Sequence, residues 1–411
     1  MGIYSIWPYF VCMGALLVFA AAPAFRAADT PPSPGRDRIS TLDGLRGFLA
    51  LGVFFHHAAI NHEYMIDGRF YLPPSRFYTM LGQVSVAMFF MITGYLFWSR
   101  MIRSRGRPDW LRLYTGRVFR IGPLYTFAAV AMLMVVFSHT GLKLNVAPLE
   151  LIKEITKWLM LGYFGEGPDI NGYTGTSELL VVAWTLRPEW IFYVSLLITS
   201  LAARDAKTHL PFTAVGWIAS LTGLTAWDAA WIAYVALFFT GMLCASLEEN
   251  KLTLKVTNRT ASILILALIG GVFTAFPSAY QASPIILIGL AFFLIVSGYD
   301  VFGLLLSHAA CRLGNISYGI YLLHLLVLTL VFSIDPVRAF ALGSPSHHWV
   351  MVLMCGALII VAALVAHVCI ERPGIKLGNR FSVTVTTYKK SFTAVLMVIA
   401  LSLASTAGVH W

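Results

Sequence analysis

The chain has 411 residues, of which 58% are hydrophobic and only 12% are charged. The charged fraction is about half that of an ordinary soluble domain, which excludes a conventional soluble enzyme. The 29 Lys and Arg residues exceed the 19 Asp and Glu residues by ten. In a soluble protein this excess would indicate a nucleic-acid partner, but here the apolar composition points first to a membrane.

Apolar segments of about 20 residues are long enough to cross a hydrocarbon core as helices. In chain order such segments cover residues 4–24, 43–61, 78–98, 121–139, 178–201, 211–227, 229–247, 260–278, 283–299, 315–334, 348–370 and 391–409. The sequence therefore predicts an all-α, polytopic bundle of transmembrane helices with about 12 spans. No stretch is long and polar enough to form a separate soluble domain.

The positive residues are divided unevenly between the loops. If the spans alternate, one set of loops holds 21 of the 29 Lys and Arg residues, Arg312 among them, and the opposite set holds six. The positive-inside rule makes the first set cytoplasmic, so both termini are predicted to lie outside the cytoplasm. These loops account for the net charge, and no nucleic-acid partner is expected.

The first and last apolar segments flank a central body. Positive residues follow the first segment rather than precede it, which favours a retained span over a cleaved signal peptide. We therefore divide the chain into an extra span with a cytoplasmic linker (1–39), a membrane core (40–380) and an extra C-terminal span (381–411). The outer loop of about 140–177 contains an aromatic stretch that either dips into the bilayer or covers an outer cavity.

The residues that commonly bind metals do not form a recognisable pattern. The five cysteines are scattered through apolar segments without CxxC spacing, which is typical of small buried residues. His62 and Glu63 lie one turn beyond His57, but no H-E-x-x-H pattern accompanies them. We expect no metal.

The most informative stretch begins Leu42-Asp43-Gly44-Leu45-Arg46-Gly47 and continues to His57. Eleven helical steps make three turns plus about 20°, so Arg46 and His57 share one stripe, about 16 Å apart along the axis. Arg46 would lie near the cytoplasmic surface and His57 near mid-bilayer. Either Arg46 anchors the helix at the headgroups and His57 bonds a neighbouring carbonyl, or the two mark a functional pathway, with His57 suited to general-base work.

At this point the sequence resembles the acyltransferase-3 family of integral membrane acyltransferases, which opens with a D-G-L-R-G element and an Arg and a His separated by ten residues. Further elements follow in the family's order: Phe89-Phe90-Met91-Ile92-Thr93-Gly94-Tyr95-Leu96, Arg117-Val118-Phe119-Arg120-Ile121-Gly122-Pro123, Trp184-Thr185-Leu186-Arg187-Pro188-Glu189-Trp190-Ile191-Phe192-Tyr193, Ile316-Ser317-Tyr318-Gly319-Ile320-Tyr321-Leu322-Leu323-His324 and Glu371-Arg372-Pro373. The resemblance covers residues 40–380, a core of about ten spans. The departures are Thr93 for Ser, Tyr95 for Phe, the charge and expected helix kink of Arg187-Pro188, and the extra span at each end.

The resemblance implies transfer of an acyl group, usually acetyl, from cytoplasmic acyl-coenzyme A to a hydroxyl of a glycan or other acceptor outside the cytoplasm. Arginine's forked donors suit the phosphates of coenzyme A, so Arg117, Arg120 and Arg112 are candidate donor-binding residues. The outer arginines of the same loop, from Arg100 to Arg107, are read as a topology signal. The implied location is a bacterial inner membrane, and a separate periplasmic partner for the transfer is an open possibility.

Each candidate site residue has an expected role. Arg46 would hold the phosphates nearest the pantetheine or orient the thioester, with Asp43 fixing its rotamer. His57 would deprotonate the acceptor hydroxyl or carry the acyl group itself. Glu189 would orient His57, bind the acceptor or form a structural ion pair with a partner other than Arg187. His324 would line the site or be a packed core histidine, and the motifs place Thr93, Trp184 and Tyr193 among the site-lining residues.

Other classes of protein compete with this interpretation. A transporter or channel would also have many spans and mid-membrane charges, but the inverted repeats of many transporters are not visible here. A second alternative, the membrane acyltransferases that use a His and an Asn, is disfavoured because they lack the opening Arg and His pair. A third, a non-catalytic scaffold of a glycan-assembly complex, is disfavoured because it does not need that pair.

Overall fold

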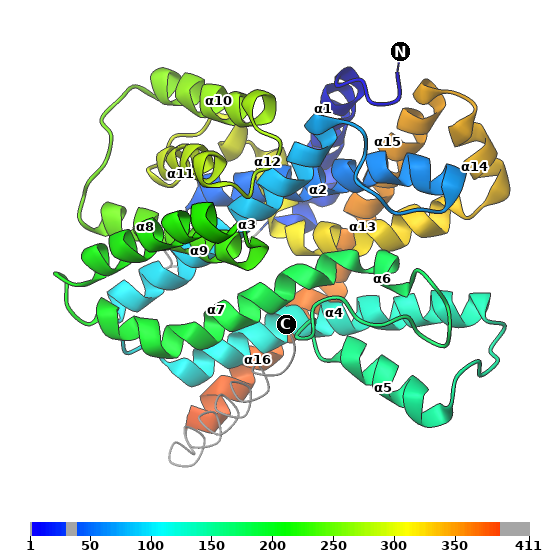
Figure 1. Ribbon diagram of the computed structural model, residues 1–411, viewed down its shortest axis with the longest axis horizontal. Helices are drawn as coiled ribbons and strands as arrows, with labels where there is room; N and C mark the ends of the chain where they lie inside the picture. The colour runs from blue at the N-terminus through cyan, green and yellow to red at the C-terminus, as the bar shows by residue number, and fades with distance from the viewer. Residues whose placement is uncertain (1, 30–38, 387–411) are drawn as a thin grey trace.

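The computed structural model describes residues 2–29 and 39–386, and within these ranges the chain is helical, with one isolated β-bridge between Ile170 and Tyr173. The α-helices are α1 (Trp7–Ala21), α2 (Ser40–Asp67), α3 (Arg76–Arg103), α4 (Trp110–His139), α5 (Pro148–Leu159), α6 (Thr176–Leu179), α7 (Leu186–Thr199), α8 (His209–Trp227), α9 (Ala230–Glu249), α10 (Asn258–Ala275), α11 (Ala282–Val296), α12 (His308–Asn315), α13 (Ser317–Phe332), α14 (Asp335–Leu342), α15 (Pro345–Ala366) and α16 (Arg372–Thr386). The short 3-10 helical turns are η1 (Pro23–Ala28), η2 (Val181–Thr185), η3 (Ser200–Ala203) and η4 (Leu304–Leu306), and η5 (His367–Glu371) is a π-helical turn. The all-α prediction is confirmed for these ranges (Figure 1).

The predicted spans fall on helices wherever the structure describes them, whereas the predicted span at 391–409 lies outside the described residues. By length and composition, six helical stretches of the described chain can cross a membrane, and α12 with α13 would make a seventh if the bent pair is one span. Two shorter apolar helices, α1 and α11, have 15 residues each. The protein is therefore a multi-pass membrane protein, and the count of about twelve spans stays a prediction.

The glycines of the D-G-L-R-G element let α2 approach its neighbours at backbone distance. A Cβ built on Gly44 would lie 1.8 Å from the carbonyl oxygen of Leu305, and one on Gly314 of α12 would lie 1.8 Å from that of Asp43. Any side chain at these positions would force the helices apart. The start of α2 is thus fixed against η4 and α12, which sets the direction in which Arg46 points.

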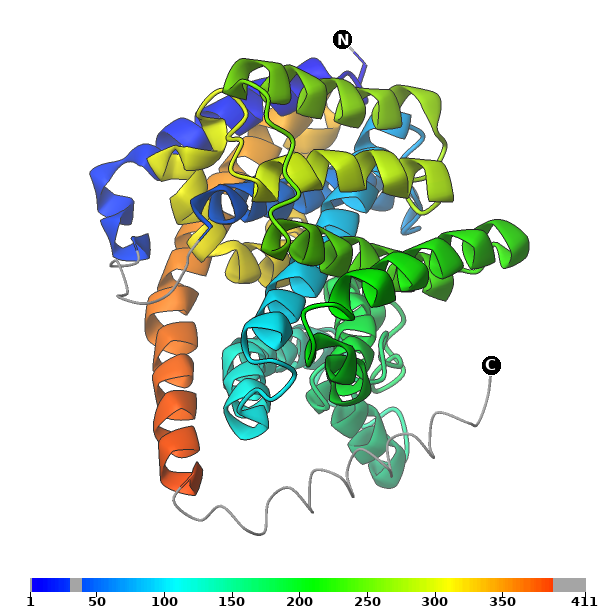
Figure 2. The ribbon, with the colours of Figure 1, turned by 90° about the vertical axis from the view of Figure 1, so that its left-hand side faces the viewer.

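The span that carries His324 is broken. Helices α12 and α13 meet at an angle of 71° around Ile316, so α13 begins inside the bundle at Ser317. Figure 1 shows α13 lying alongside α2, and the two helices pack against each other. Helix α15 packs against α13 and continues through the π-helical turn η5 into α16, a rod that is clear in Figure 2 and that packs against α4.

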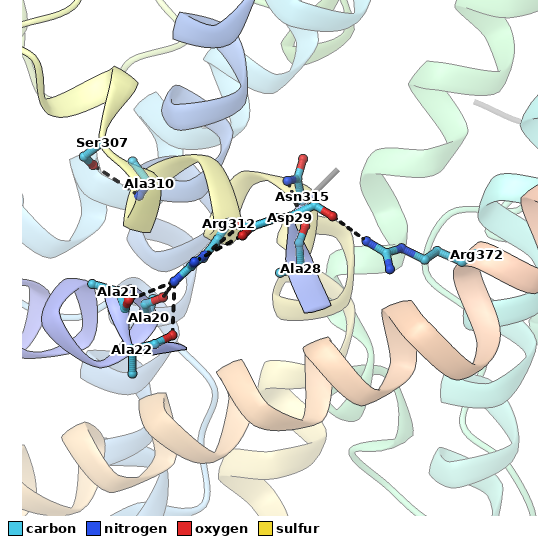
Figure 3. Close-up of polar contacts among 10 residues, drawn as sticks. All are labelled: Ala20, Ala21, Ala22, Ala28, Asp29, Ser307, Ala310, Arg312, Asn315 and Arg372. Atoms are coloured by element: carbon cyan, nitrogen blue, oxygen red, sulfur yellow. Dashed lines mark hydrogen bonds and ion pairs between the residues drawn. The ribbon is translucent and has the colours of Figure 1, made fainter. Parts of the chain in front are cut away.

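Arg312, which the sequence places among the loop residues, lies in the short helix α12, and its side chain is buried, with 7% exposure. Its Nε and Nη2 donate to the two carboxylate oxygens of Asp29 at 2.7 and 3.1 Å, and its Nη1 donates to the carbonyls of residues 20–22 at the end of α1 (Figure 3). A cation at the C-terminal end of a helix is also favoured by the helix dipole. The Arg312 guanidinium holds the pKa of the Asp29 carboxyl below its usual range.

A second arginine, Arg372, contacts the segment that follows α1. Arg372, the first residue of α16, donates from Nη2 to the backbone carbonyl of Asp29 at 3.1 Å, and Asn315 donates to that of Ala28 at 3.0 Å (Figure 3). The predicted extra span, α1, is therefore joined to the membrane core through polar contacts as well as through its apolar face against α15.

Pro188 lies in the first turn of α7, directly after the 3-10 turn η2. It is the third residue of α7, where a proline is tolerated because the first N–H groups of a helix have no partner within it.

The predicted outer loop of 140–177 folds into α5 and the start of α6 and packs on the bundle. The indole N–H of Trp190 in α7 donates to the carbonyl of Leu161 in this loop at 2.9 Å.

Candidate active site

A cavity of about 160 Å³ lies between α2, α3, α4, α7 and α13. Its walls combine apolar, aromatic and charged side chains. They are Arg46, Val86, Phe89, Phe90, Ile92, Thr93, Leu96, Arg117, Arg120, Ile121, Thr185, Leu186, Glu189, Ser317, Tyr318 and Tyr321. Residues from five separate motifs, far apart in the chain, thus meet around one space.

The charges of the wall are unbalanced, because three arginines and one carboxylate line the cavity. Arg117 lies over two aromatic rings, with its Cζ 4.2 Å from the centroid of Phe97 and 5.4 Å from that of Tyr193. A guanidinium stacked by its face keeps its N–H groups, which lie in the plane, for an anion. The wall is suited to a negatively charged ligand.

Glu189 belongs to this arginine-lined cavity. Its Oε2 accepts the hydroxyl proton of Tyr193 at 2.5 Å, and its Oε1 is 3.5 Å from the donor hydroxyl of Thr93. Arg117 and Arg46 lie near enough for their charges to act on it. Of the expected roles for Glu189, orientation of His57 finds no contact here: its carboxylate bonds to Tyr193 and Thr93 instead.

Behind the cavity wall lies a buried carboxylate that the sequence reasoning did not single out. Glu371, with 1% exposure, is 3.9 Å from the Nη2 of Arg120 and 2.7 Å from the Nδ1 of His367. Arg372 donates from Nε to the other ring nitrogen of His367 at 3.0 Å, so the N–H of His367 faces Glu371. The E-R-P element was visible in the sequence, but its carboxylate lies 251 positions after Arg120, and only the fold joins them.

His57 and His324 form a buried pair. The Nε2 of His324 and the Nδ1 of His57 are 2.9 Å apart, and the two side chains are 0% and 8% exposed. Each Nδ1 also meets a backbone carbonyl four residues earlier in its own helix, Ile320 for His324 and Val53 for His57, at 3.1 Å in both cases. Phe70 stacks on His57 with ring centroids 6.0 Å apart.

Tyr321 separates the histidine pair from the arginine-lined cavity. Tyr321 and Phe89 are in the cavity wall, whereas His57 and His324 are not. The ring of Tyr321 lies 6.4 Å from that of His324 and 5.8 Å from that of Phe89, and its hydroxyl is 2.9 Å from the Thr185 hydroxyl. The expected straight path from Arg46 to His57 therefore passes a layer of aromatic side chains.

The remaining candidates are spread around the cavity rather than in it. The exposed side chain of Arg112 does not line the cavity, and the backbone N–H of this residue is capped by Asp109. Asp43 acts electrostatically on Arg46 from outside the wall, and Trp184 packs against Phe90. Within residues 2–29 and 39–386, no group of three or more His, Cys, Asp or Glu side chains could hold a metal ion.

These features define a class: a multi-pass helical membrane protein with an arginine-lined cavity between its helices and a buried histidine pair beside it. The chain belongs to the acyltransferase-3 family, because the family model described as an acyltransferase domain matches residues 39–367. The matched range includes every residue of the cavity wall and both histidines of the pair, while Glu371 follows its end. No curated protein and no solved structure matches the chain.

Proposed function

We propose that this acyltransferase moves a short acyl group, acetyl in the first instance, from cytoplasmic acyl-coenzyme A to a hydroxyl of a glycan on the outer side of the membrane. The observation that carries the proposal is the position of Arg46 and His57 on one helix, with Arg46 in the arginine-lined cavity and His57 beyond it. This arrangement suits a reaction in which the anionic donor enters at the Arg46 end and the base acts at the His57 end.

The cavity wall supports a coenzyme A thioester as donor. Arg46, Arg117 and Arg120 offer forked N–H donors to phosphate oxygens, and the predicted cytoplasmic segment from Arg100 to Arg120, with seven arginines, holds the most positive residues of any predicted cytoplasmic loop. Arg112 would meet the donor outside the cavity, nearer the loop. Family membership and the wall chemistry both favour a donor substrate over a transported solute.

The size of the cavity supports a short acyl group. A cavity of about 150 Å³ holds one benzene molecule, so the 160 Å³ between these helices suits an acetyl thioester better than a long hydrocarbon chain. The greater part of coenzyme A would remain outside, toward the exposed Arg112 in the first turn of α4.

In the proposed reaction His57 acts as base or acyl carrier. As base, it takes the proton of the acceptor hydroxyl while the hydroxyl oxygen bonds to the thioester carbonyl carbon; the carbon–sulfur bond then breaks and the thiolate of coenzyme A receives the proton. As acyl carrier, the ring nitrogen bonds to the thioester carbonyl carbon and the carbon–sulfur bond breaks, which releases the thiolate of coenzyme A. The acceptor oxygen then bonds to the acyl carbon, the carbon–nitrogen bond breaks, and the hydroxyl proton goes to the thiolate. Both routes need the thioester to pass Tyr321 and Phe89.

The test uses sealed vesicles that contain the purified protein and radiolabelled acetyl-coenzyme A. We expect turnover of the thioester, and a loss of at least about 100-fold for His57→Ala with normal membrane insertion. An active His57→Ala protein would remove His57 from the mechanism, and intact thioester with the wild-type protein would refute the transfer itself. Mass spectrometry of surface and secreted glycans from cells with and without the gene then identifies the acceptor.

A further inference from the structure

The hydrogen bonds of the histidine pair determine where its protons lie. A backbone carbonyl has no proton to donate, so the Nδ1 of His324, 3.1 Å from the Ile320 carbonyl, must carry hydrogen. A neutral imidazole has one N–H, which leaves the Nε2 of His324 as an acceptor. This nitrogen faces the Nδ1 of His57 at 2.9 Å, which therefore donates the hydrogen.

The same logic fixes the tautomer of His57. Its Nδ1–H is shared between two acceptors, the Nε2 of His324 and the carbonyl of Val53 at 3.1 Å. The lone pair of the neutral His57 ring is then on Nε2. A base with its N–H held at one nitrogen and its lone pair at the other is ready to take a proton.

We propose that His324 is a positioning residue for His57: it holds the Nδ1–H tautomer, presents Nε2 as the reacting atom and stabilises the proton that His57 takes up. The inference rests on the proposed function, since it assigns a partner to the base named there. It adds the reacting atom, which is Nε2 whether His57 acts as base or as acyl carrier.

The second half of the role concerns charge. When Nε2 of His57 takes the hydroxyl proton, a buried imidazolium forms. The carboxylate of Glu189 does not bond to this charged ring, because it bonds to Tyr193 and Thr93 in the cavity. A hydrogen bond from a charged donor is about twice as strong as a neutral one. The Nε2 lone pair of His324 therefore stabilises the charged ring of His57. The proton then leaves from Nε2 of His57 to the thiolate, and both rings return to their starting tautomers.

Two matched substitutions separate positioning from packing. A Gln side chain can place an acceptor near the position of a histidine Nε2, so His324→Gln keeps the bond to His57, whereas His324→Leu fills similar space without it. With acetyl-coenzyme A in vesicles we expect kcat to fall about 10-fold for His324→Gln and about 100-fold for His324→Leu, with KM for the donor within about 3-fold of wild type in both. Equal kcat for wild type and His324→Leu would overturn the proposal, as would equal losses in the two variants.

A spectroscopic measurement tests the geometry without turnover. In protein labelled with nitrogen-15 histidine, the His57 signals are those missing from His57→Gln, and protonated and bare ring nitrogens have well-separated shifts. We expect Nδ1 of His57 to be protonated and coupled to a second nitrogen across the hydrogen bond in the wild type, and the coupling to be lost in His324→Leu. A protonated Nε2 in resting His57 would refute the assignment even if the His324 variants do not fold.

The two proposals fail in different ways. If the wild-type protein leaves acetyl-coenzyme A intact, the proposed function fails while the spectroscopic pairing stands. If His57→Gln is inactive and His324→Leu is fully active, only the positioning role of His324 is lost.

Discussion

Two regions of this protein place arginines between packed helices, and they use them in opposite ways. Arg312 has oxygen acceptors at all three guanidinium nitrogens, the shortest at 2.7 Å from Asp29. In the cavity, Arg120 is 3.9 Å from Glu371 and Arg117 rests on aromatic rings. A buried arginine whose donors are all used ties chain segments together, whereas arginines held at longer range around a space retain donors for a ligand.

The largest expected effect comes from removing charge at the cavity. We expect Arg117→Gln to reduce kcat/KM for acetyl-coenzyme A by about 100-fold. Each charge-assisted contact to a phosphate contributes about 1.5–3 kcal/mol, and a Gln side chain does not reproduce the guanidinium stacked on the two rings. The measurement is thioester turnover in vesicles. A value close to wild type would break the comparison, since Arg117 would then be a structural residue like Arg312.

Glu371→Gln tests the support of the cavity. The amide keeps the shape but not the charge that faces Arg120 and the N–H of His367. We expect KM for the donor to rise about 10-fold, with a smaller change in kcat, since Glu371 lies behind the wall and not in it. A change confined to kcat would assign the carboxylate to the chemical step instead.

Arg312→Gln should affect stability more than turnover. Loss of the contacts to Asp29 and to the end of α1 costs about 1–3 kcal/mol by analogy with other hydrogen bonds to charged groups. We expect a melting temperature several degrees lower in detergent and a specific activity of the folded protein within about 3-fold of wild type. An unchanged melting temperature together with inactivity would contradict the division between the two regions.

Arg112→Gln gives the smallest expected effect. This side chain is exposed and outside the cavity wall, so a contact to the donor would be screened by water and salt. We expect KM to rise about 2-fold at low ionic strength and to match the wild type at high salt. A rise that persists in salt would show that the donor-binding surface extends well beyond the cavity.

The sequence was most informative about what is local. Apolar length predicted the helices, and helical spacing put Arg46 and His57 on one stripe and Arg117 beside Arg120. It could not join His57 to His324, because 267 positions separate them and their bond depends on how α13 crosses α2. Arg312 looked like any other loop arginine, since nothing in its neighbourhood reveals that Asp29 will meet it.

The break before α13 has a mechanical consequence. Helix α2 carries Arg46 and His57, and α13 carries Tyr318 and His324, so the same two rods supply both the cavity wall and the histidine pair. The 71° bend gives α13 an elbow at its inner end, close to where Gly314 and Gly44 fix the base of α2. Because the two helices are in backbone contact at that end, the angle at which α13 leaves the elbow sets the distance between the two imidazoles further along the helices.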